Sequence, residues 1–228
     1  MTSSSTTLHD SWRKAARVFQ ERAGEYDSWY EDSLLFATEL SALQQIELPL
    51  SDPKVEIGTG PGRFAEQLGV TTGIDPAPAA LQRALKRGIM GIVGIGEQLP
   101  IRSEKAGTIF MLFTLCFLVD PGLVLEECHR ILKKDGRLVI GQVPALSTWG
   151  QQLENKKKNG NPYYRHARFY TISDTLTMLK QANFSLLETH STLLQSPESL
   201  DGVETAQPGI NEQAGFCVLV AEKKENTR

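Results

Sequence analysis

Cysteine is scarce in this sequence, and its few occurrences exclude two kinds of stabilising site. Only 3 cysteines occur among 228 residues, and no two of them form a C-x-x-C pair. Cys116, Cys128 and Cys217 are widely spaced in apolar surroundings. Wide spacing in apolar surroundings, without a C-x-x-C pair, favours buried free thiols over a disulfide or a zinc site. We therefore expect three free, buried thiols in a reducing compartment and no metal site.

A strong charge and a long apolar run are also missing. The 24 Lys and Arg residues oppose 27 Asp and Glu residues, which leaves a net charge of -3. The longest apolar stretch, 108–119, is too short to span a bilayer, and the N-terminal T-S-S-S-T-T has neither the basic nor the apolar region of a secretory leader. We therefore expect a cytoplasmic protein without nucleic-acid or membrane partners.

The length and the ordinary composition predict one well-buried domain, and the apolar pattern predicts its class. Short apolar runs alternate with helical periodicity, which favours a parallel sheet with right-handed crossovers. Strands are expected at 54–57, 72–75, 89–93, 108–113, 137–143, 184–189 and 215–222. Helices are expected at 10–22, 33–46, 64–68 and 122–133, from Pro78 and from Thr171, with disorder over 1–8 and a polar loop over 144–168.

The stretch V-E-I-G-T-G-P-G-R-F at 55–64 is the expected binding site. It reads as a strand, a turn with three glycines at alternate positions, and a helix that begins near Arg63. Glycine lets the backbone approach a ligand, and the helix N-terminus suits an anion. A dinucleotide fingerprint would need its third glycine where Arg63 stands, which weakens an NAD assignment. An ordinary turn is the remaining alternative.

Three stretches carry a resemblance to a known family. Glu56, followed by alternating glycines from Gly58, resembles motif I of the class I S-adenosylmethionine (SAM) dependent methyltransferases. G-I-G-E-Q-L-P-I at 94–101 is similar to the family's G-D-A-E-x-L-P-F, and D-P-G-L-V-L-E-E-C-H-R-I-L-K-K-D-G-R-L-V-I at 120–140 is similar to its D-P...L-x-E-x-x-R-x-L-K-P-G-G-x-L-x-I. The sequence resembles the type 11 group, which includes ubiquinone/menaquinone and biotin-pathway enzymes.

The resemblance implies an architecture and an activity. The fold would be a three-layer, Rossmann-like α/β fold with a mostly parallel seven-stranded sheet and an antiparallel last strand. Residues 1–48 would form a lid of helices, and 49–228 a methyltransferase domain with a substrate-side insertion at about 144–170. The enzyme, of class EC 2.1.1.-, would transfer a methyl group from SAM to a small molecule by in-line displacement, as a monomer or homodimer.

The family motifs and the strand ends assign residues to SAM. Asp75 ends the second expected strand, where a carboxylate can accept both hydroxyls of a ribose. The glycine loop would hold the amino-acid end of SAM, with Glu56 close to its ammonium group. The expected cofactor-binding residues are Glu56, Gly58, Thr59, Gly60, Gly62, Asp75, Pro76, Gly96, Glu97, Phe113 and Thr114.

The acceptor side is expected in two segments that would cap the strand ends, 24–30 and 144–168. The expected substrate-binding residues are Tyr26, Trp29, Tyr30, Trp149 and Arg168. A general base is needed only if the accepting atom carries a proton, and Tyr26 and His166 are the candidates. A hinge that packs on the core is the alternative role for 24–30, and plain exposure is the alternative for His166.

Two departures from the family pattern keep another function open. Ile95 stands where the family has an aspartate that reaches the adenine amino group, and Ala106-Gly107 stand where the fourth strand usually opens with Phe-Asp. The missing acids make a noncatalytic SAM-binding or sensing module the alternative to an enzyme. An NAD-linked enzyme is the third hypothesis.

Overall fold

The computed structural model describes residues 4–224, with the side chains of 12–224. Helices and strands alternate along most of the chain. The helices are α1 (Ser4–Glu21), α2 (Ala23–Ser28), α3 (Leu34–Gln44), α4 (Arg63–Leu68), α5 (Pro78–Lys86), α6 (Pro121–Ile131), α7 (Thr148–Lys158) and α8 (Ile172–Gln181), with a 3-10 turn η1 (Leu115–Phe117). The strands are β1 (Lys54–Ile57), β2 (Thr72–Asp75), β3 (Met90–Val93), β4 (Ala106–Leu112), β5 (Leu132–Gln142), β6 (Phe184–Thr192), β7 (Gln207–Pro208) and β8 (Phe216–Lys223).

The strands form a single sheet in the order β3-β2-β1-β4-β5-β8-β6-β7. Strands β1 to β5 pair in parallel, whereas β8 runs antiparallel between β5 and β6. The Rossmann-like α/β prediction is confirmed. The described chain has an eighth strand because the two-residue β7 pairs with β6. The strand order reverses at β1 and β4, where such sheets bind ligands.

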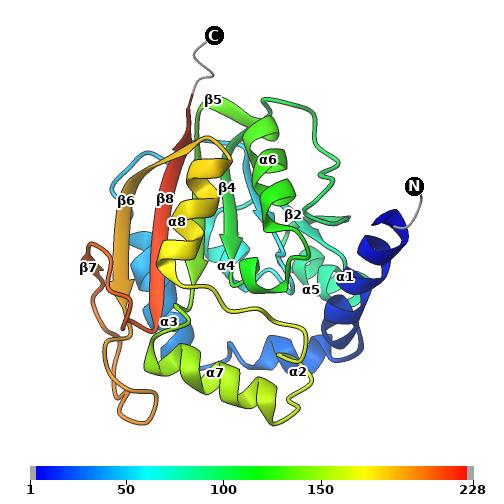
Figure 1. Cartoon of the computed structure of the whole chain (residues 1–228). Helices are drawn as coiled ribbons and strands as arrows, with labels where there is room; N and C mark the ends of the chain where they lie inside the picture. Colours follow the sequence, from blue (N-terminus) through cyan, green and yellow to red (C-terminus); the bar gives the residue numbers. More distant parts are fainter. Residues whose placement is uncertain (1–3, 225–228) are drawn as a thin grey trace.

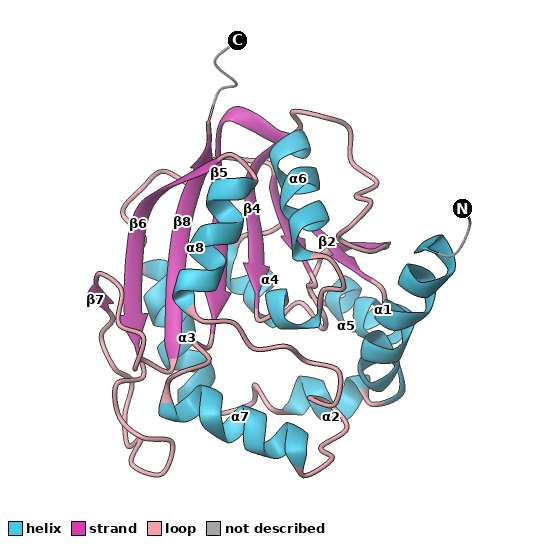
Figure 2. Ribbon diagram, viewed as in Figure 1, coloured by secondary structure: helices cyan, strands magenta, loops and turns pink. Residues whose placement is uncertain are grey.

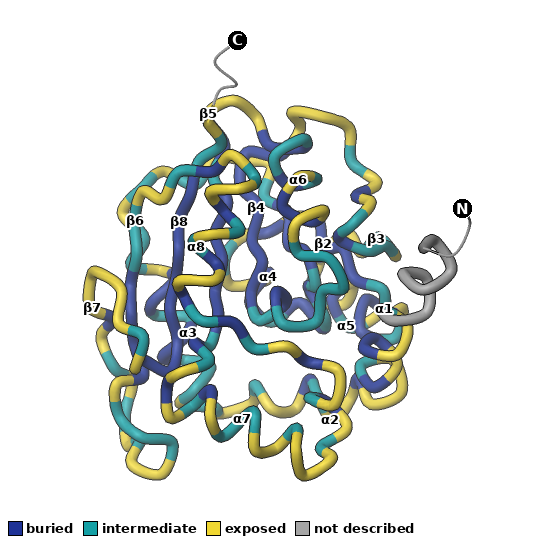
Figure 3. The backbone as a smooth tube through the Cα atoms, viewed as in Figure 1, coloured by how far each residue is buried: buried dark blue, intermediate teal, exposed yellow. Residues whose placement is uncertain are grey.

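Helices cover both faces of the sheet (Figures 1 and 2). Alternate residues of β4 point to opposite layers, since Ile109 and Met111 pack with α6 and α8, whereas Phe110 and Leu112 pack with α3 and α4. All four side chains are buried, and the central strands form the dark band of Figure 3. Burial on both faces explains why this strand has an almost wholly apolar sequence.

Three stretches differ from the expected secondary structure. Helix α1 begins at Ser4, so the disorder expected over 1–8 is wrong from residue 4 onward, and residues 1–3 lie outside the described part. Most of 24–30 is α2. The polar segment after β5 contains α7, capped by the Ser147 hydroxyl, which accepts a hydrogen bond from the Gly150 amide at 3.0 Å. Only Gly150 of this helix is buried, so α7 lacks a core-facing pattern.

Two further details of the expected pattern are corrected. The segment expected to be a polar loop contains three consecutive lysines, 156–158. They form the last turn of α7, where basic residues suit the helix dipole. Strand β5 begins at Leu132 instead of 137, because the chain passes from α6 into the strand without an intervening loop. These shifts change element ends and leave the order of the sheet unchanged.

The three thiols are free, as the sequence predicts, and two of them are buried. All three cysteines are free, with Cys128 and Cys217 buried and Cys116 partly buried. Within the described residues, no helix has the length and apolar character needed to cross a membrane. The same residues contain no group of three His, Cys, Asp or Glu side chains placed to hold a metal ion.

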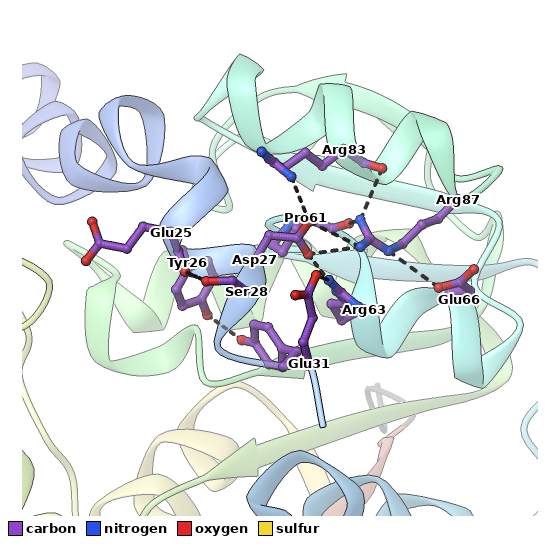
Figure 4. A network of polar contacts seen from close by, with 11 residues as sticks. Glu25, Tyr26, Asp27, Ser28, Glu31, Pro61, Arg63, Glu66, Arg83 and Arg87 are labelled. Carbon is purple, nitrogen blue, oxygen red and sulfur yellow. Dashed lines mark hydrogen bonds and ion pairs between the residues drawn. The ribbon is translucent and has the colours of Figure 1, made fainter. Parts of the chain in front are cut away.

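A buried carboxylate fastens α2 to the body of the protein. Asp27 accepts hydrogen bonds from Arg63 at 2.6 Å, Arg83 at 2.9 Å and Arg87 at 3.0 Å. Figure 4 shows the three arginines, from α4 and the end of α5, converging on this residue of α2. Burial raises the pKa of Asp27, but hydrogen bonds from Arg63 and Arg87 outweigh it, so the pKa lies below its ordinary value of 3.8.

We predict that Asp27→Asn loosens α2. The free energy of unfolding of the protein at pH 7 should fall by about 2 kcal/mol, because the three arginines lose the carboxylate that they share. The pKa of Asp27 is lower in the folded chain, so its stabilisation is present above pH 3.8 and is lost as the pH falls through the folded-state value. The deficit of the variant, measured by urea unfolding, should therefore shrink in acid.

The matched control is Glu21→Gln on α1. Glu21 pairs with Arg17 on the surface, where the two side chains are 55% and 77% exposed. Exposed pairs contribute little, so this variant should unfold like the wild type. An equal effect of both substitutions would show that Asp27 has no special role in holding α2.

Candidate functional site

Two adjoining pockets lie at the carboxyl ends of the parallel strands. We call the first the glycine-loop pocket. It is lined by Trp12, Ala15, Ala16, Phe19, Tyr26, Ile57, Gly58, Gly60, Ile74, Asp75, Pro76, Gly94, Ile95, Gly96, Glu97, Leu112, Phe113, Thr114, Phe117 and Leu118. The second, the aromatic pocket, is lined mainly by α2, α3, the end of β5, α7 and 163–170. Phe19, Tyr26, Phe113 and Phe117 line both pockets, so these four rings form the boundary between them.

The glycine loop turns tightly against the end of β4. The amide of Gly58 donates to the carbonyl of Ile74 at 2.7 Å, and Gly58 has a φ of +72°. A Cβ atom there would lie 2.2 Å from the Thr114 hydroxyl oxygen. Thr114 in turn donates to the carbonyl of Ile57 at 3.1 Å. The position therefore requires glycine for its backbone conformation and for its close approach to Thr114.

Asp75 stands at the end of β2, beside this loop. One carboxylate oxygen accepts a hydrogen bond from the Gly60 amide at 2.9 Å, and the other accepts from the Ala77 amide at 2.8 Å. Burial raises the pKa of Asp75 to about 6 despite these two hydrogen bonds. Each oxygen keeps a further lone pair, so the carboxylate can still accept two ligand hydroxyls.

Three of the expected cofactor-binding residues do not line the glycine-loop pocket, namely Glu56, Thr59 and Gly62. Glu56 is buried behind the loop, where it accepts a hydrogen bond from the Thr59 hydroxyl at 2.8 Å. Burial raises the pKa of Glu56 to about 8. Gly62 precedes α4, and a Cβ atom there would lie 3.0 Å from that of Ala84. These residues support the loop from beneath, whereas the other eight expected residues line the pocket.

The two positions that depart from the family pattern lie in different places. Ile95 lines the glycine-loop pocket beside Gly96, and it gives this wall an apolar surface. The neighbouring Glu97 accepts hydrogen bonds from the amides of Val119 and Asp120 at 3.2 and 3.4 Å. Gly107 lies at the start of β4, where its amide donates to the carbonyl of Pro53 at 2.9 Å. The missing acid at Gly107 is therefore remote from the pocket.

The expected acceptor residues from 24–30 meet in the aromatic pocket. The Tyr30 hydroxyl donates to that of Tyr26 at 2.6 Å, and the rings of Trp29 and Tyr163 have centroids 4.5 Å apart. The Tyr26 ring also covers the glycine loop, because it lies 3.5 Å from where a Cβ atom of Gly60 would stand. Burial chiefly raises the pKa of Tyr26 well above its ordinary range.

The later segment is only partly as expected. Trp149 lines the aromatic pocket, and its indole N-H donates to the carbonyl of Gln195 at 2.9 Å. Arg168 does not line it, because its guanidinium lies over the ring of Tyr170, 5.1 Å from the centroid. His166 is exposed and lines neither pocket.

Several lining residues were not predicted. They come from α1, α3, the turn after β4, the end of β5 and the segment after α7, which are far apart in the sequence. They include Phe19, Phe36, Glu39, Phe117, Gln142, Tyr163, Tyr164 and Phe169. The clustering of Tyr163 and Tyr164 in a polar segment was one local signal. The acidic Glu39 within an apolar helix was another unusual feature.

Comparison with known proteins places the chain among methyltransferases. A family model described as "Methyltransferase domain" matches residues 55–140. An uncharacterized Mycobacterium tuberculosis protein is 37% identical over 216 residues, which cover 93% of this chain and 76% of that protein. A demethylmenaquinone methyltransferase of Thermotoga maritima is 31% identical over 140 residues, 56% of this chain and 61% of that enzyme.

A solved structure is similar over nearly the whole chain. It is a SAM-dependent methyltransferase of Thermotoga maritima, described as a possible histamine N-methyltransferase. The two chains superpose with a TM-score of 0.85 at 32% identity, over 92% of this chain and 100% of the other. The similarity therefore extends well beyond residues 55–140, which the family model matches.

We predict that Gly58→Ala destabilises the protein by about 3 kcal/mol, because strain at positive φ adds to a collision with Thr114. Gly160→Ala is the matched control, with a φ of +78° and no neighbour within 4 Å of a new Cβ atom. Gly160→Ala should lower the free energy of unfolding by about 1 kcal/mol, because only the backbone strain remains. Urea unfolding of both variants measures the difference, and equal losses would contradict the close contact at Gly58.

Proposed function

This chain belongs to the class I SAM-dependent methyltransferases of the type 11 group, and on that premise we propose that it methylates a small-molecule acceptor. SAM is its cofactor. When bound, SAM supplies a methyl group that a positively charged sulfur makes electrophilic. One observation above all supports the proposal: the two pockets share four aromatic residues, so the pocket suited to the cofactor directly adjoins a second pocket.

The residues of the glycine-loop pocket fit SAM. Gly58 and Gly60 line it without side chains, so the backbone of the loop is open to the amino-acid end of the cofactor. Asp75 has lone pairs left for the ribose hydroxyls. Ile95 and Leu118 offer an apolar wall for the adenine ring in place of the usual acid. The adenine is then held by packing and by nearby backbone groups.

We propose that residues 1–48 act as the lid of this site. Asp27 holds α2 against α4 and α5, and the adjacent Tyr26 lies over the glycine loop. Closing the site excludes water and orients the acceptor, which supplies most of what methyl transfer requires. Because burial raises the pKa of Tyr26, its hydroxyl stays protonated at neutral pH and serves as a hydrogen-bonding group.

Small acceptors are favoured by the form of the aromatic pocket. Its walls come from α2, α3 and α7, and its lining is largely apolar side chains. The relatives do not settle the acceptor. One is named for demethylmenaquinone and another is described as a possible histamine N-methyltransferase. These acceptors differ in chemistry, so the acceptor of this chain has to be inferred from its own pocket.

A noncatalytic SAM-binding module remains the alternative, favoured by Ile95 at the adenine position. Measurements of ligand binding and of methyl transfer distinguish the enzyme from the noncatalytic module.

We predict that S-adenosylhomocysteine or SAM at a hundred times its dissociation constant stabilises the protein by about 2.7 kcal/mol, measured by thermal unfolding, with no shift from NAD. Incubation of a metabolite extract with SAM labelled in its methyl group should then transfer the label to a small molecule.

The possible results have distinct meanings. No stabilisation of folded, ligand-free protein by either sulfur compound would refute the proposal. Stabilisation without label transfer to any component of the extract would support the sensing module instead.

We predict that Asp75→Asn weakens the binding of S-adenosylhomocysteine about tenfold or more, because an amide replaces a charged hydrogen-bond acceptor. Asp135→Asn is the control, since Asp135 is exposed near the start of β5, whereas the pocket residue Gln142 ends that strand. Calorimetric titration measures both variants after circular dichroism has shown that they are folded. A dissociation constant within twofold of the wild type for Asp75→Asn would mean that the ribose lies elsewhere.

A further inference from the structure

Glu39 is a buried acid without a partner in the aromatic pocket. It lies on α3, with 6% of its surface exposed, and its side chain lines the pocket. Among residues 12–224, no hydrogen bond or ion pair reaches its carboxyl group. Burial raises the pKa of Glu39 well above its ordinary value of 4.5. A buried acid is costly without a partner, so the pocket lacks a group that a ligand can supply.

The other lining residues do not supply a positive charge. No lysine, arginine or histidine lines the described pocket, and Glu39 is its one carboxylate. The charge of Glu39 affects the hydroxyls of two lining tyrosines, Tyr30 and Tyr164. Burial chiefly raises the pKa of Tyr30, with smaller contributions from Tyr26 and then from Glu39. Burial chiefly raises the pKa of Tyr164 to about 12, with smaller contributions from Cys116 and Glu39. The pocket therefore disfavours anionic ligands such as carboxylates and phosphates.

Aromatic rings form most of the remaining surface. The chain has 9 Phe, 5 Tyr and 3 Trp residues. Five of the phenylalanines, all five tyrosines and two of the tryptophans line this pocket. The face of an aromatic ring attracts cations, and the ring also packs well against hydrocarbon. Rings together with a single carboxylate are the chemistry that recognises an organic cation.

We propose that the methyl acceptor carries a positively charged amine, which pairs with Glu39 while its hydrocarbon body packs against the surrounding rings. The inference rests on the proposed function, because it takes the aromatic pocket to be the acceptor site. The rival is a neutral acceptor whose oxygen accepts a hydrogen bond from protonated Glu39. The two differ in whether the ligand must be charged.

Matched pairs of amines and alcohols test the charge requirement. We would titrate benzylamine, 2-phenylethylamine and tryptamine, and the three corresponding alcohols, into wild-type protein saturated with S-adenosylhomocysteine at pH 7, using calorimetry. At least one amine should bind about tenfold or more tightly than its alcohol, because a hydrogen bond to a charged group exceeds one to a neutral group. Failure of every amine to bind, or equal affinity within each pair, would overturn the inference.

The variant Glu39→Gln assigns the preference to this residue. It should weaken amine binding about tenfold or more and change alcohol binding by less than about twofold. Glu47→Gln, the same charge change at an exposed position just after α3, should leave both unchanged. Unchanged amine binding in folded Glu39→Gln would overturn the inference. If that variant does not fold, the wild-type preference between amine and alcohol decides.

The result can be separated from the proposed function. Stabilisation by S-adenosylhomocysteine and transfer of label to a neutral metabolite, without amine binding, would leave the methyltransferase proposal intact and remove the amine. Absence of S-adenosylhomocysteine binding would instead remove the premise of both.

Discussion

The ion cluster at Asp27 is the constraint on which the rest of the site depends. Its carboxylate gathers guanidinium groups from α4 and from the end of α5, and so fixes α2 beside the glycine loop. Tyr26 is the preceding residue, and its place over Gly60 follows from that attachment. Since Tyr26 also belongs to the four shared rings, the same cluster sets the boundary between the glycine-loop pocket and the aromatic pocket.

Buried acids give the two pockets a common electrostatic character. Asp75 lines one pocket and Glu39 lines the other, and Glu56 lies behind the glycine loop. Burial raises the pKa of all three carboxyl groups, and among the described residues none of the three forms an ion pair. Polar and cationic ligand groups would complete these environments. Asp75 and Glu39 thus keep unused hydrogen-bonding capacity at the site, as binding sites commonly do.

The sequence identified a larger share of the residues that line the glycine-loop pocket than of those that line the aromatic pocket, for a physical reason. The glycine loop and Asp75 are local features, because a strand end and the turn after it fix their positions. The aromatic pocket is assembled from segments that only the folded chain brings together, and the acidic Glu39 in the apolar helix α3 does not by itself tell which cavity it faces. Helix α7 was missed because a mostly exposed helix has little apolar periodicity. His166 and Arg168 lie in the expected segment, but both are exposed and neither lines the aromatic pocket.

The two pockets meet at Phe19, Tyr26, Phe113 and Phe117, and we propose that they form one site. A crystal structure of the chain with S-adenosylhomocysteine tests this most directly. We predict that the ribose hydroxyls lie within hydrogen-bonding distance of the Asp75 carboxylate and that the sulfur faces the four shared rings. A nucleoside bound outside the glycine-loop pocket, or a sulfur turned away from the aromatic pocket, would contradict the account.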